Sequence, residues 1–334
     1  MTDENNPIER KVQLTGGSTY TVSLPKSWAN GQHIEPGVPV DLYTRGDQLI
    51  ITRGPADPSE DRRRSRIDAS GQDASTLGLC VGAAYVAGCE EIHIEGLTES
   101  AKRRAVARSI RRFVGLEVMT EDESSLTAQT MLDAADLSPE QTLAQLQRTA
   151  MEMHAEALQA VIEADGDLGV QIAKQDDTVD RLFALVTRGF QRSLVDPAVA
   201  LSRDDLSSFE YYMAARQLER VADHAEKIAN IADRLERAPP KDVAEALAAH
   251  GAEAREIVDD SLEGLLGDGP ALTTIIARSD ELLEDIEILD QRLYEADLAD
   301  SYLLGVVLDS IARTAQYGSN VAEAGIQAHY RPEL

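Results

Sequence analysis

Cysteine is nearly absent from this sequence, whose 334 residues include only Cys80 and Cys89. Two cysteines are too few for a disulfide framework, and no further ligands stand at zinc-site spacing from them. Long apolar runs are also missing, because the longest, LGLCVGAAYVAG at 77–88, is far short of the ~20 residues that span a membrane. The opening MTDENNPIER is acidic and has no apolar segment of a secretory signal. We therefore expect a reduced, cytoplasmic protein without membrane insertion.

Basic charge, and lysine above all, is scarce. Lysine supplies six of the 32 basic residues, whereas Asp and Glu number 59, giving a formal net charge of -27. Strongly hydrated carboxylates keep a surface soluble where salt screens attraction between charges, so a halophilic source of the haloarchaeal kind is expected. Disorder is the competing interpretation of such charge. Because 43% of the residues are hydrophobic and recur with regular periods, several folded domains are expected instead.

Residues 10–53 have the periodicity of short strands. KVQLT and TYTVSL flank a turn at Gly16 and Gly17, LPKSWANG gives a helical turn after Pro25, and VPVDLYTRGDQLIITR alternates around a second turn at 45–48. A β unit this short buries little apolar surface alone. It is expected to need a partner chain.

The stretch TVSLPKSWANGQHIEPGVPVDLYTRGDQLIIT resembles the SpoVT/AbrB family of swapped-hairpin DNA-binding domains. The resemblance covers about the first 55 residues and implies an interleaved homodimer. The basic residues that it implies as DNA contacts are Arg10, Lys11, Lys26 and Arg45. Residues 9–54 hold five bases against four acids, which favours a face kept clear of acid for phosphates. Ordinary surface charge on a unit that only dimerises is the alternative.

A linker composition, GPADPSEDRRRSR at 54–66, precedes a small α/β segment. In this segment the pattern predicts a helix around 74–88, a strand in EEIHIEG, a helix in SAKRRAVARSIRRFVG and a strand in LEVMTE. One face of the second helix is basic, through Arg104, Arg108, Arg111 and Arg112. Such a face contacts DNA or another anion, or it pairs with neighbouring carboxylates, and both interpretations stay open.

From Ser138 to about Tyr330 the apolar period is helical. Ser138, followed by Pro139 and Glu140, predicts an N-cap. Three helices, a Pro-rich joint (RAPPKD) and three further helices indicate an internal duplication, and the short loops imply antiparallel up-and-down bundles. The predicted helices are 139–164, 168–195, 207–236, 242–266, 270–298 and 299–330.

Acidic residues recur at four-residue spacing in the first bundle. Asp176 and Asp180 lie on its second predicted helix, and Glu219 and Asp223 on its third. At ~100° per residue each pair falls on a flank of the apolar stripe, so that facing flanks would bring four carboxylates together. Oxygen clusters of this kind bind Mg²⁺, Mn²⁺ or iron. Chance pairing on a solvated acidic surface is the alternative, because the chain has 59 acids.

Residues from about 138 to 330 resemble the PhoU family of phosphate-signalling regulators, which consist of two tandem three-helix bundles. AVIEADGDLGVQIAKQDDTVDRLF and RQLERVADHAEKIANIA carry the resemblance, through the signatures D-x-x-x-D and R-x-L-E-R-x-x-D-H. The metal ligands that it implies, for an iron, zinc or other divalent metal cluster, are Asp176, Asp180, Glu219 and Asp223. Ala312 and Gln316 replace the two acids of the third helix in the second bundle, so at most one cluster is expected. His224 has three possible roles, which stay open: it binds the metal, joins a hydrogen-bond network, or lies at the surface.

The sequence thus predicts a mainly α protein with a small β N-terminus. A swapped-hairpin domain (1–55) and a linker with a small α/β segment (56–135) precede tandem PhoU-like three-helix bundles (136–238 and 239–334). The expected function is phosphate-responsive regulation of phosphate uptake. Its expected partners are a second copy of the chain, DNA, and a phosphate ABC transporter or its signalling partners.

Two other functions compete with this one. A dimeric scaffold or adaptor that does not bind DNA is the first alternative. A carboxylate-bridged di-iron bundle is disfavoured, because it needs E-x-x-H on facing helices and the one such pair, Glu90 and His93, falls in a predicted strand. No glycine-rich phosphate loop or nucleophile elbow is present, so no enzymatic activity is expected.

Overall fold

The computed structural model describes residues 7–53, 63–131, 138–196, 206–267, 269–296 and 300–331. Two compact units divide the chain, the first formed by the first 61 residues and the second by Arg62–Glu333. Along the described ranges, no helix combines the length and the hydropathy that crossing a membrane requires.

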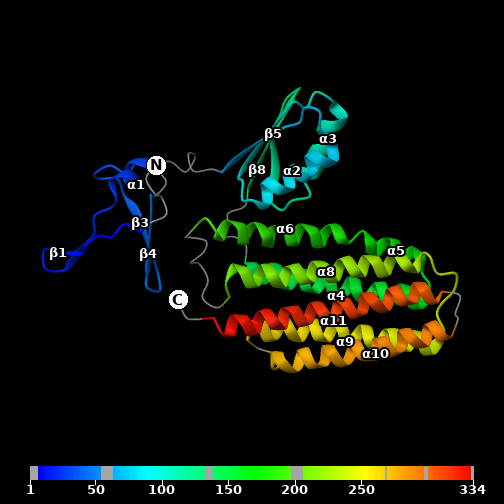
Figure 1. Cartoon of the computed structure of the whole chain (residues 1–334). Helices are drawn as coiled ribbons and strands as arrows, with labels where there is room; N and C mark the ends of the chain where they lie inside the picture. Colours follow the sequence, from blue (N-terminus) through cyan, green and yellow to red (C-terminus); the bar gives the residue numbers. More distant parts are fainter. Residues whose placement is uncertain are drawn as a thin grey trace. The chain divides into compact units, whose positions relative to one another are not determined.

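The N-terminal unit, called the head below, contains two hairpins and one short helix (Figure 1). Strand β1 (Gln13–Thr15) pairs antiparallel with β2 (Thr19–Thr21), and Gly16 and Gly17 make the turn with φ of 64° and 82°. Helix α1 (Lys26–Gly31) follows, and then β3 (Val40–Arg45) pairs antiparallel with β4 (Gln48–Arg53) in a separate two-stranded sheet. The predicted strands, turns and helical turn are confirmed.

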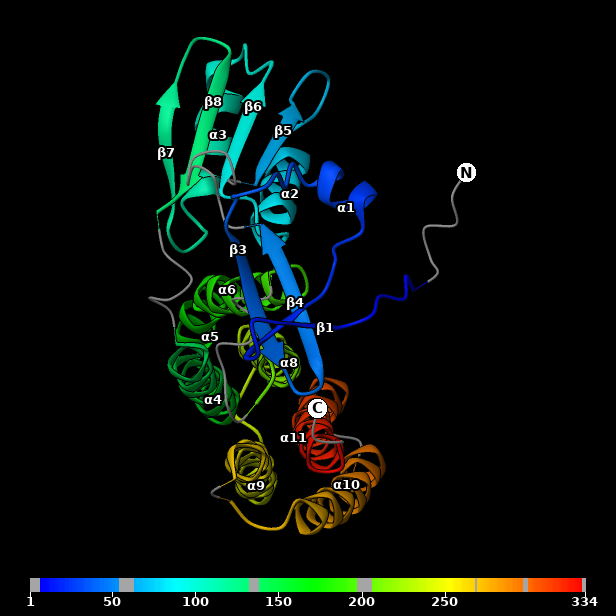
Figure 2. The same ribbon diagram turned by 90° about the vertical axis from the view of Figure 1, so that its left-hand side faces the viewer.

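A four-stranded sheet with two helices opens the second unit. The strands β5 (Arg64–Asp68), β6 (Glu91–Glu95), β7 (Leu116–Glu121) and β8 (Ser125–Thr130) lie in the order β5-β6-β8-β7. Strands β5 and β6 are parallel and the other neighbours antiparallel, while α2 (Ala74–Val86) and α3 (Ser100–Ile110) lie against the sheet (Figure 2). Alternate residues such as Ile92, Ile94 and Leu126 are fully buried beneath these helices.

Strands β5 and β8 were not predicted, and residues 64–66, assigned to the linker, belong to β5. The sequence RSRID buries only Ile67, so its local pattern carries little strand signal. Pairing with β6 supplies the stabilisation, including ion pairs of Arg64 with Glu91 at 3.5 Å and of Arg66 with Glu95 at 3.9 Å. Local periodicity in the sequence cannot predict a strand that forms because it pairs with a neighbouring strand.

Long antiparallel helices form the rest of the unit (Figure 1). The first set comprises α4 (Pro139–Glu163), α5 (Gly166–Ala173), α6 (Asp176–Ser193) and α8 (Ser208–Ala232); the second comprises α9 (Lys241–Leu266), α10 (Leu272–Glu295) and α11 (Ser301–His329). Helix α4 begins as predicted, because the Ser138 hydroxyl accepts a hydrogen bond from the Gln141 amide at 3.3 Å.

The helix predicted at 168–195 is two helices, α5 and α6. At the junction the Lys174 and Gln175 amides donate hydrogen bonds to the carbonyl oxygens three residues earlier, at 3.3 and 2.8 Å. Such hydrogen bonds form a tighter turn than an α-helix does, and the helix axis changes direction there. Close packing explains the break: a Cβ on Gly169 of α5 would lie 2.4 Å from the Ala229 carbonyl oxygen of α8. Because α5 must lie this close to α8, it cannot continue along the axis of α6.

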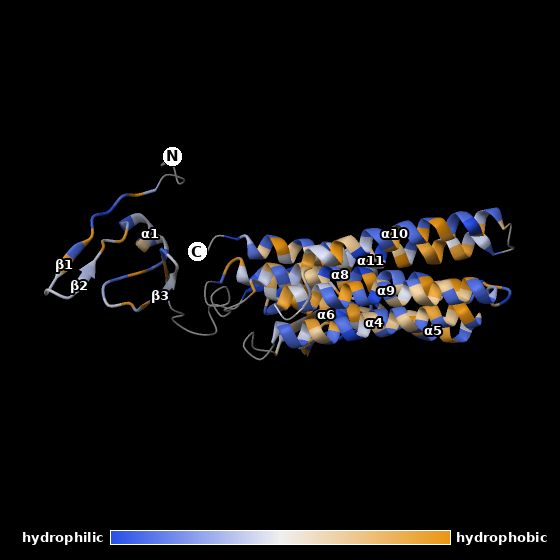
Figure 3. Ribbon diagram, turned by 90° about the horizontal axis from the view of Figure 1, so that it is seen from below, coloured by the Kyte–Doolittle hydropathy of each residue, from blue (hydrophilic) through white to orange (hydrophobic). Residues whose placement is uncertain are grey.

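One hydrophobic core runs through both bundles. Buried side chains from α4, α5, α6, α8, α9, α10 and α11 belong to a single cluster, and α8 and α11 pack against each other. In Figure 3 hydrophilic (blue) and hydrophobic (orange) residues alternate along the helix ribbons, as expected of helices with one apolar face. The two predicted bundles are therefore joined by a continuous core rather than by a linker.

Buried polar side chains also join the bundles. His154 of α4 is fully buried, and its Nδ1 lies 3.1 Å from Arg255 Nη1 of α9, which can only donate. Burial, followed by the charge of Arg255, lowers the pKa of His154 to about 3, so the imidazole is neutral. Further bonds between the bundles join Gln147 Nε2 to Asp259 Oδ1 at 2.7 Å and Asn320 Nδ2 to Gln217 Oε1 at 3.0 Å.

A buried arginine fastens the α/β segment to the first bundle. Arg188 of α6 donates through Nη1 to the carbonyl oxygens of Tyr85 and Cys89, the latter at 2.9 Å. Its guanidinium carbon also lies 4.8 Å from the centroid of the Tyr85 ring, within the range of a cation–π contact. Helices α2 and α6 are thereby held in contact.

Candidate functional site

Four carboxylates line the edge where α6 meets α8, and we call Asp176, Asp180, Glu219 and Asp223 the acidic edge. The predicted apolar stripe of α8, from Leu218 to Ala232, is buried, and Glu219 and Asp223 fall on its flank, Glu219 half-buried and Asp223 exposed. Since α5 ends at Ala173, Asp176 is the first residue of α6, with its side chain half-buried.

The acids of the two helices repel one another. Burial, and after it the charges of Asp180, Glu226 and Asp223, raise the pKa of Asp176 to about 6. Burial and then Asp223 raise the pKa of Glu219 to about 7, against the opposing effect of Arg216. Desolvation is also the first cause of the raised pKa values of Asp180 and Asp223. The acids predicted from separate helices therefore interact electrostatically across α6 and α8.

Two oxygens of the acidic edge are buried without a hydrogen bond. They are Asp176 Oδ1 and Glu219 Oε2, although the latter lies 4.0 Å from Arg216 Nη1. Buried acceptors normally have donors, and a cation would satisfy them. Across the residues that the structure describes, however, no three His, Cys, Asp or Glu side chains are arranged as a ready metal site. The metal cluster and its ligand set therefore stay a prediction.

Two charges outside the predicted ligand set also act on this edge. Glu226, one turn beyond Asp223, raises the pKa of Asp176, and Arg112, two residues beyond the end of α3, lowers that of Asp180. Arg112 also forms an ion pair with Asp177, next to Asp176. The spacing of Glu226 from Asp223 on α8 was visible in the sequence, whereas the approach of α3 was not.

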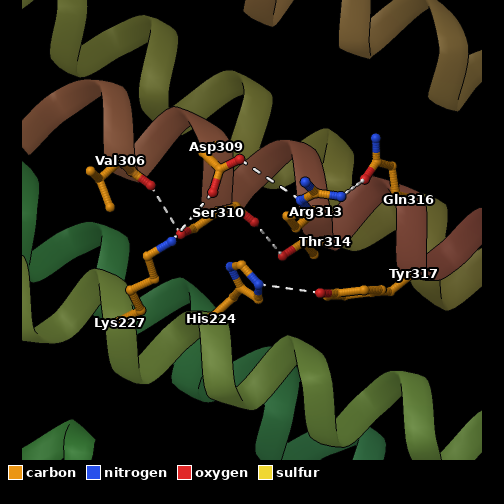
Figure 4. Close-up of polar contacts among 9 residues, drawn as sticks. All are labelled: His224, Lys227, Val306, Asp309, Ser310, Arg313, Thr314, Gln316 and Tyr317. Atoms are coloured by element: carbon orange, nitrogen blue, oxygen red, sulfur yellow. Dashed lines mark hydrogen bonds and ion pairs between the residues drawn. The ribbon is translucent and has the colours of Figure 1, made fainter. Parts of the chain in front are cut away.

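The second bundle presents different chemistry at the matching positions (Figure 4). Gln316 accepts a hydrogen bond from Arg313 Nη1 at 3.0 Å, and Arg313 Nε lies 3.8 Å from Asp309. Asp309 in turn pairs with Lys227 of α8 at 3.3 Å. This carboxylate forms ion pairs with two bases, whereas Glu219 of the acidic edge has one basic neighbour at ion-pair distance, Arg216 at 4.0 Å.

His224 takes part in a contact between helices. Its Nε2 lies 3.2 Å from the Tyr317 hydroxyl of α11, and the two rings are tilted with centroids 5.7 Å apart (Figure 4). Its Nδ1 is buried without a hydrogen-bond partner in the described part of the chain. Of the three roles left open, the structure supports membership of a network between α8 and α11.

The predicted DNA contacts lie at separate places in the head. Arg10 and Lys11 precede β1, Lys26 is the first residue of α1, and Arg45 is the last of β3, with its side chain outside the described atoms. The side chains of Arg10, Lys11 and Lys26 are exposed or half-buried. No hydrogen bond or ion pair within the described head joins these three side chains to one another, and their contact with DNA stays a prediction.

Helix α3 ends at Ile110, earlier than predicted, so Arg104 and Arg108 lie on it whereas Arg111 is its C-cap and Arg112 follows it. All four side chains are solvent-exposed, and only part of their charge is neutralised. Arg112 pairs with Asp177, as the ion-pairing alternative predicted. Arg104, Arg108 and Arg111 make no ion pair with any residue that the structure describes, so an anion remains the alternative for them. The Glu90–His93 pair lies at the sheet, where His93 Nδ1 is 2.9 Å from the Thr127 hydroxyl, away from the helical core.

Two family models match parts of this chain. The family model described as the PhoU domain matches residues 143–232, a range that includes the acidic edge. The family model described as antidote-toxin recognition MazE, bacterial antitoxin, matches residues 13–59. The resemblance to PhoU in the helical region, with an AbrB-like head before it, is thereby confirmed.

Individual relatives carry the same name. The PhoU homolog of the phosphate-specific transport system in Synechocystis sp. is 26% identical over 172 residues, which is 49% of this chain and 76% of that protein. The homolog from Pseudomonas aeruginosa is 35% identical over 86 residues, 26% of this chain and 34% of that protein. The crystal structure of PhoU from Pseudomonas aeruginosa aligns with a TM-score of 0.47 and 17% identity, over 57% of this chain and 95% of that one.

Proposed function

We propose that this protein is a phosphate-responsive regulator of phosphate uptake that acts in the cytoplasm. The observation that carries the proposal is the PhoU match over residues 143–232, together with curated relatives named as accessory proteins of phosphate-specific transport. The helical unit contacts the transporter or its signalling partners, and the head carries the response to DNA. The protein regulates rather than catalyses.

The head is proposed to form a homodimer. None of its described residues is buried, and the large apolar side chains that it exposes are Ile8, Val12, Leu14, Tyr20, Val22, Leu42 and Leu49. So much apolar surface on a small unit is stabilised when a second copy covers it.

Mass measurement in solution tests the dimer. Leu14→Glu is expected to shift the full chain from dimer to monomer, because a charge would be buried in the interface. Gln13→Glu is the matched control, since Gln13 is the adjacent residue of β1 and points to the other face. A monomeric wild type, or a dimer unchanged by Leu14→Glu, would contradict the proposal.

DNA binding through the head is proposed from its charge and its family match. Titration of promoter DNA of phosphate-transporter genes at several salt concentrations tests it. Replacing Lys26 with Gln should weaken binding and reduce the salt slope by about 1, the effect of one lost phosphate contact. Arg53→Gln serves as the control, and the absence of any binding by the wild type at low salt would leave a head that only dimerises.

The acidic edge is proposed to hold the iron, zinc or other divalent metal. Its raised pKa values and its two buried, unbonded oxygens support the proposal, because a cation relieves both the repulsion and the desolvation. Elemental analysis of purified protein would show metal in the wild type and a loss in Asp223→Asn. Asp290→Asn, in the second bundle, should keep the metal; equal metal content in all three would remove the assignment.

The regulatory role itself is tested in cells. In a strain that lacks this protein, transcripts of the phosphate transporter and phosphate uptake should lose their dependence on external phosphate. Unchanged transcripts and unchanged uptake would overturn the function proposed here.

A further inference from the structure

A cavity of about 520 Å³ lies where α2 and α3 of the α/β segment meet α6 of the first bundle. Its size falls within the range of roughly 300–1,000 Å³ typical of small-molecule pockets, and is much larger than one phosphate ion needs. The lining side chains used below are Ser75 and Leu79 of α2, Ser109 of α3, Arg112 and Phe113 just after α3, and Arg181 of α6.

The floor of the cavity is a strip of α2 with minimal side chains. A Cβ on Gly78 would lie 2.9 Å from Ser109 Oγ, and one on Gly82 would lie 2.9 Å from Phe113 Cζ. These glycines therefore let Ser109 of α3 and Phe113, just after α3, pack directly on α2, and their side chains cover the two glycine positions. Leu79, with 74% of its surface exposed, adds an apolar wall. A flat apolar body can lie against the side chains of Leu79 and Phe113.

The rim of the cavity is polar, with donors left unused. The Arg181 side chain forms no hydrogen bond or ion pair with any described residue, and neither hydroxyl, of Ser75 or of Ser109, is hydrogen-bonded within that same part of the chain. Arg112 is engaged by Asp177, but a guanidinium has five N–H donors. In a chain with a net charge of -27, two arginines on one cavity favour an anionic ligand.

We propose that this cavity binds a phosphate monoester with a flat organic body, of the nucleoside monophosphate class. Arg181 and Arg112 receive the phosphate through charge-assisted hydrogen bonds, with the two serine hydroxyls as further donors. The base lies between Leu79 and Phe113. A ligand held in this way bridges the α/β segment to the helix that carries half of the acidic edge.

Calorimetric titration of the full chain with adenosine monophosphate tests the site, with adenosine, ribose 5-phosphate and inorganic phosphate as partial ligands. Adenosine monophosphate should bind most tightly. Arg181→Gln should weaken it at least about tenfold, the loss of one charge-assisted contact, while leaving adenosine unaffected. Arg181 is exposed and makes no such contact within the described chain, so this variant should fold as the wild type does.

Two further variants sharpen the result. Leu79→Glu places a negative charge beside the phosphate on an already exposed position and should abolish binding. Arg148→Gln, an exposed arginine of α4 outside the cavity, should change nothing. Binding that survives both Arg181→Gln and Leu79→Glu, inorganic phosphate binding as tightly as the nucleotide, or no nucleotide binding at all would each overturn the proposal.

Discussion

His154 makes the stability of the helical unit sensitive to acid. The imidazole is fully buried and neutral, with a pKa of about 3 that burial lowers from 6.5. Between these two values the unfolded chain binds a proton that the folded chain excludes, so stability is complete above pH 6.5 and falls as the pH falls. At about pH 5 the unfolding equilibrium shifts by a factor of about 30, or about 2 kcal/mol.

The assay is denaturant unfolding of wild type and His154→Asn at about pH 7.5 and about pH 5, at one salt concentration. Asn keeps an acceptor for Arg255 but has no proton to gain, so the wild type should lose about 2 kcal/mol more than the variant between the two pH values. Carboxylate titration is common to both proteins and cancels in this difference. His329→Asn, at the exposed end of α11, should behave as the wild type.

Two results would refute this reasoning. An equal loss of stability in wild type and His154→Asn means that the buried imidazole is not excluded from protonation. A larger loss in the variant means that the contact with Arg255, rather than the proton, dominates the response to acid.

Three further predictions follow from other contacts. Glu219→Gln should stabilise the metal-free protein by about 1–3 kcal/mol at about pH 8, because a pKa raised to about 7 makes the wild type lose stability as the pH rises through that value; unfolding at pH 8 and about pH 4.5, where the gain should vanish, checks the sign. Gly169→Ala should cost more than about 2 kcal/mol by calorimetry, since its Cβ meets the Ala229 carbonyl oxygen at 2.4 Å and α5 must move off α8. Arg188→Met should cost about 2–3 kcal/mol and open the α/β segment to limited proteolysis, because two carbonyl oxygens lose their donor.

Features set by neighbouring residues in the sequence could be predicted. The turn at Gly16 and Gly17, the Ser138 cap and the buried stripe of α8 each depend on local chemistry, namely positive φ, a side-chain acceptor and the 3.6-residue period. The acidic pairs beside the apolar stripes of α6 and α8 could be predicted from the same 3.6-residue period.

Features set by distant residues could not be predicted. The break between α5 and α6 falls at Lys174 and Gln175, which are good helix formers, and close packing of Gly169 on α8 overrides them. The contact of His154 with Arg255 spans 101 residues of sequence. The position of Arg112 beside α6 likewise depends on how the α/β segment packs against the first bundle, which sequence periodicity does not predict.

The continuous core of the two bundles bears on how freely their surfaces can differ. Once seven helices share one interior, neither half has to remain a self-sufficient fold, and selection acts on the sum of their stabilities. The second bundle can then carry the Arg313–Gln316 pairing in place of surface acids without loss of the shared core, because the apolar surface that it covers does not depend on those positions. A truncation after α8 would expose the apolar faces that α9 and α11 now cover, so the half with the acidic edge depends for its folding on the half without one.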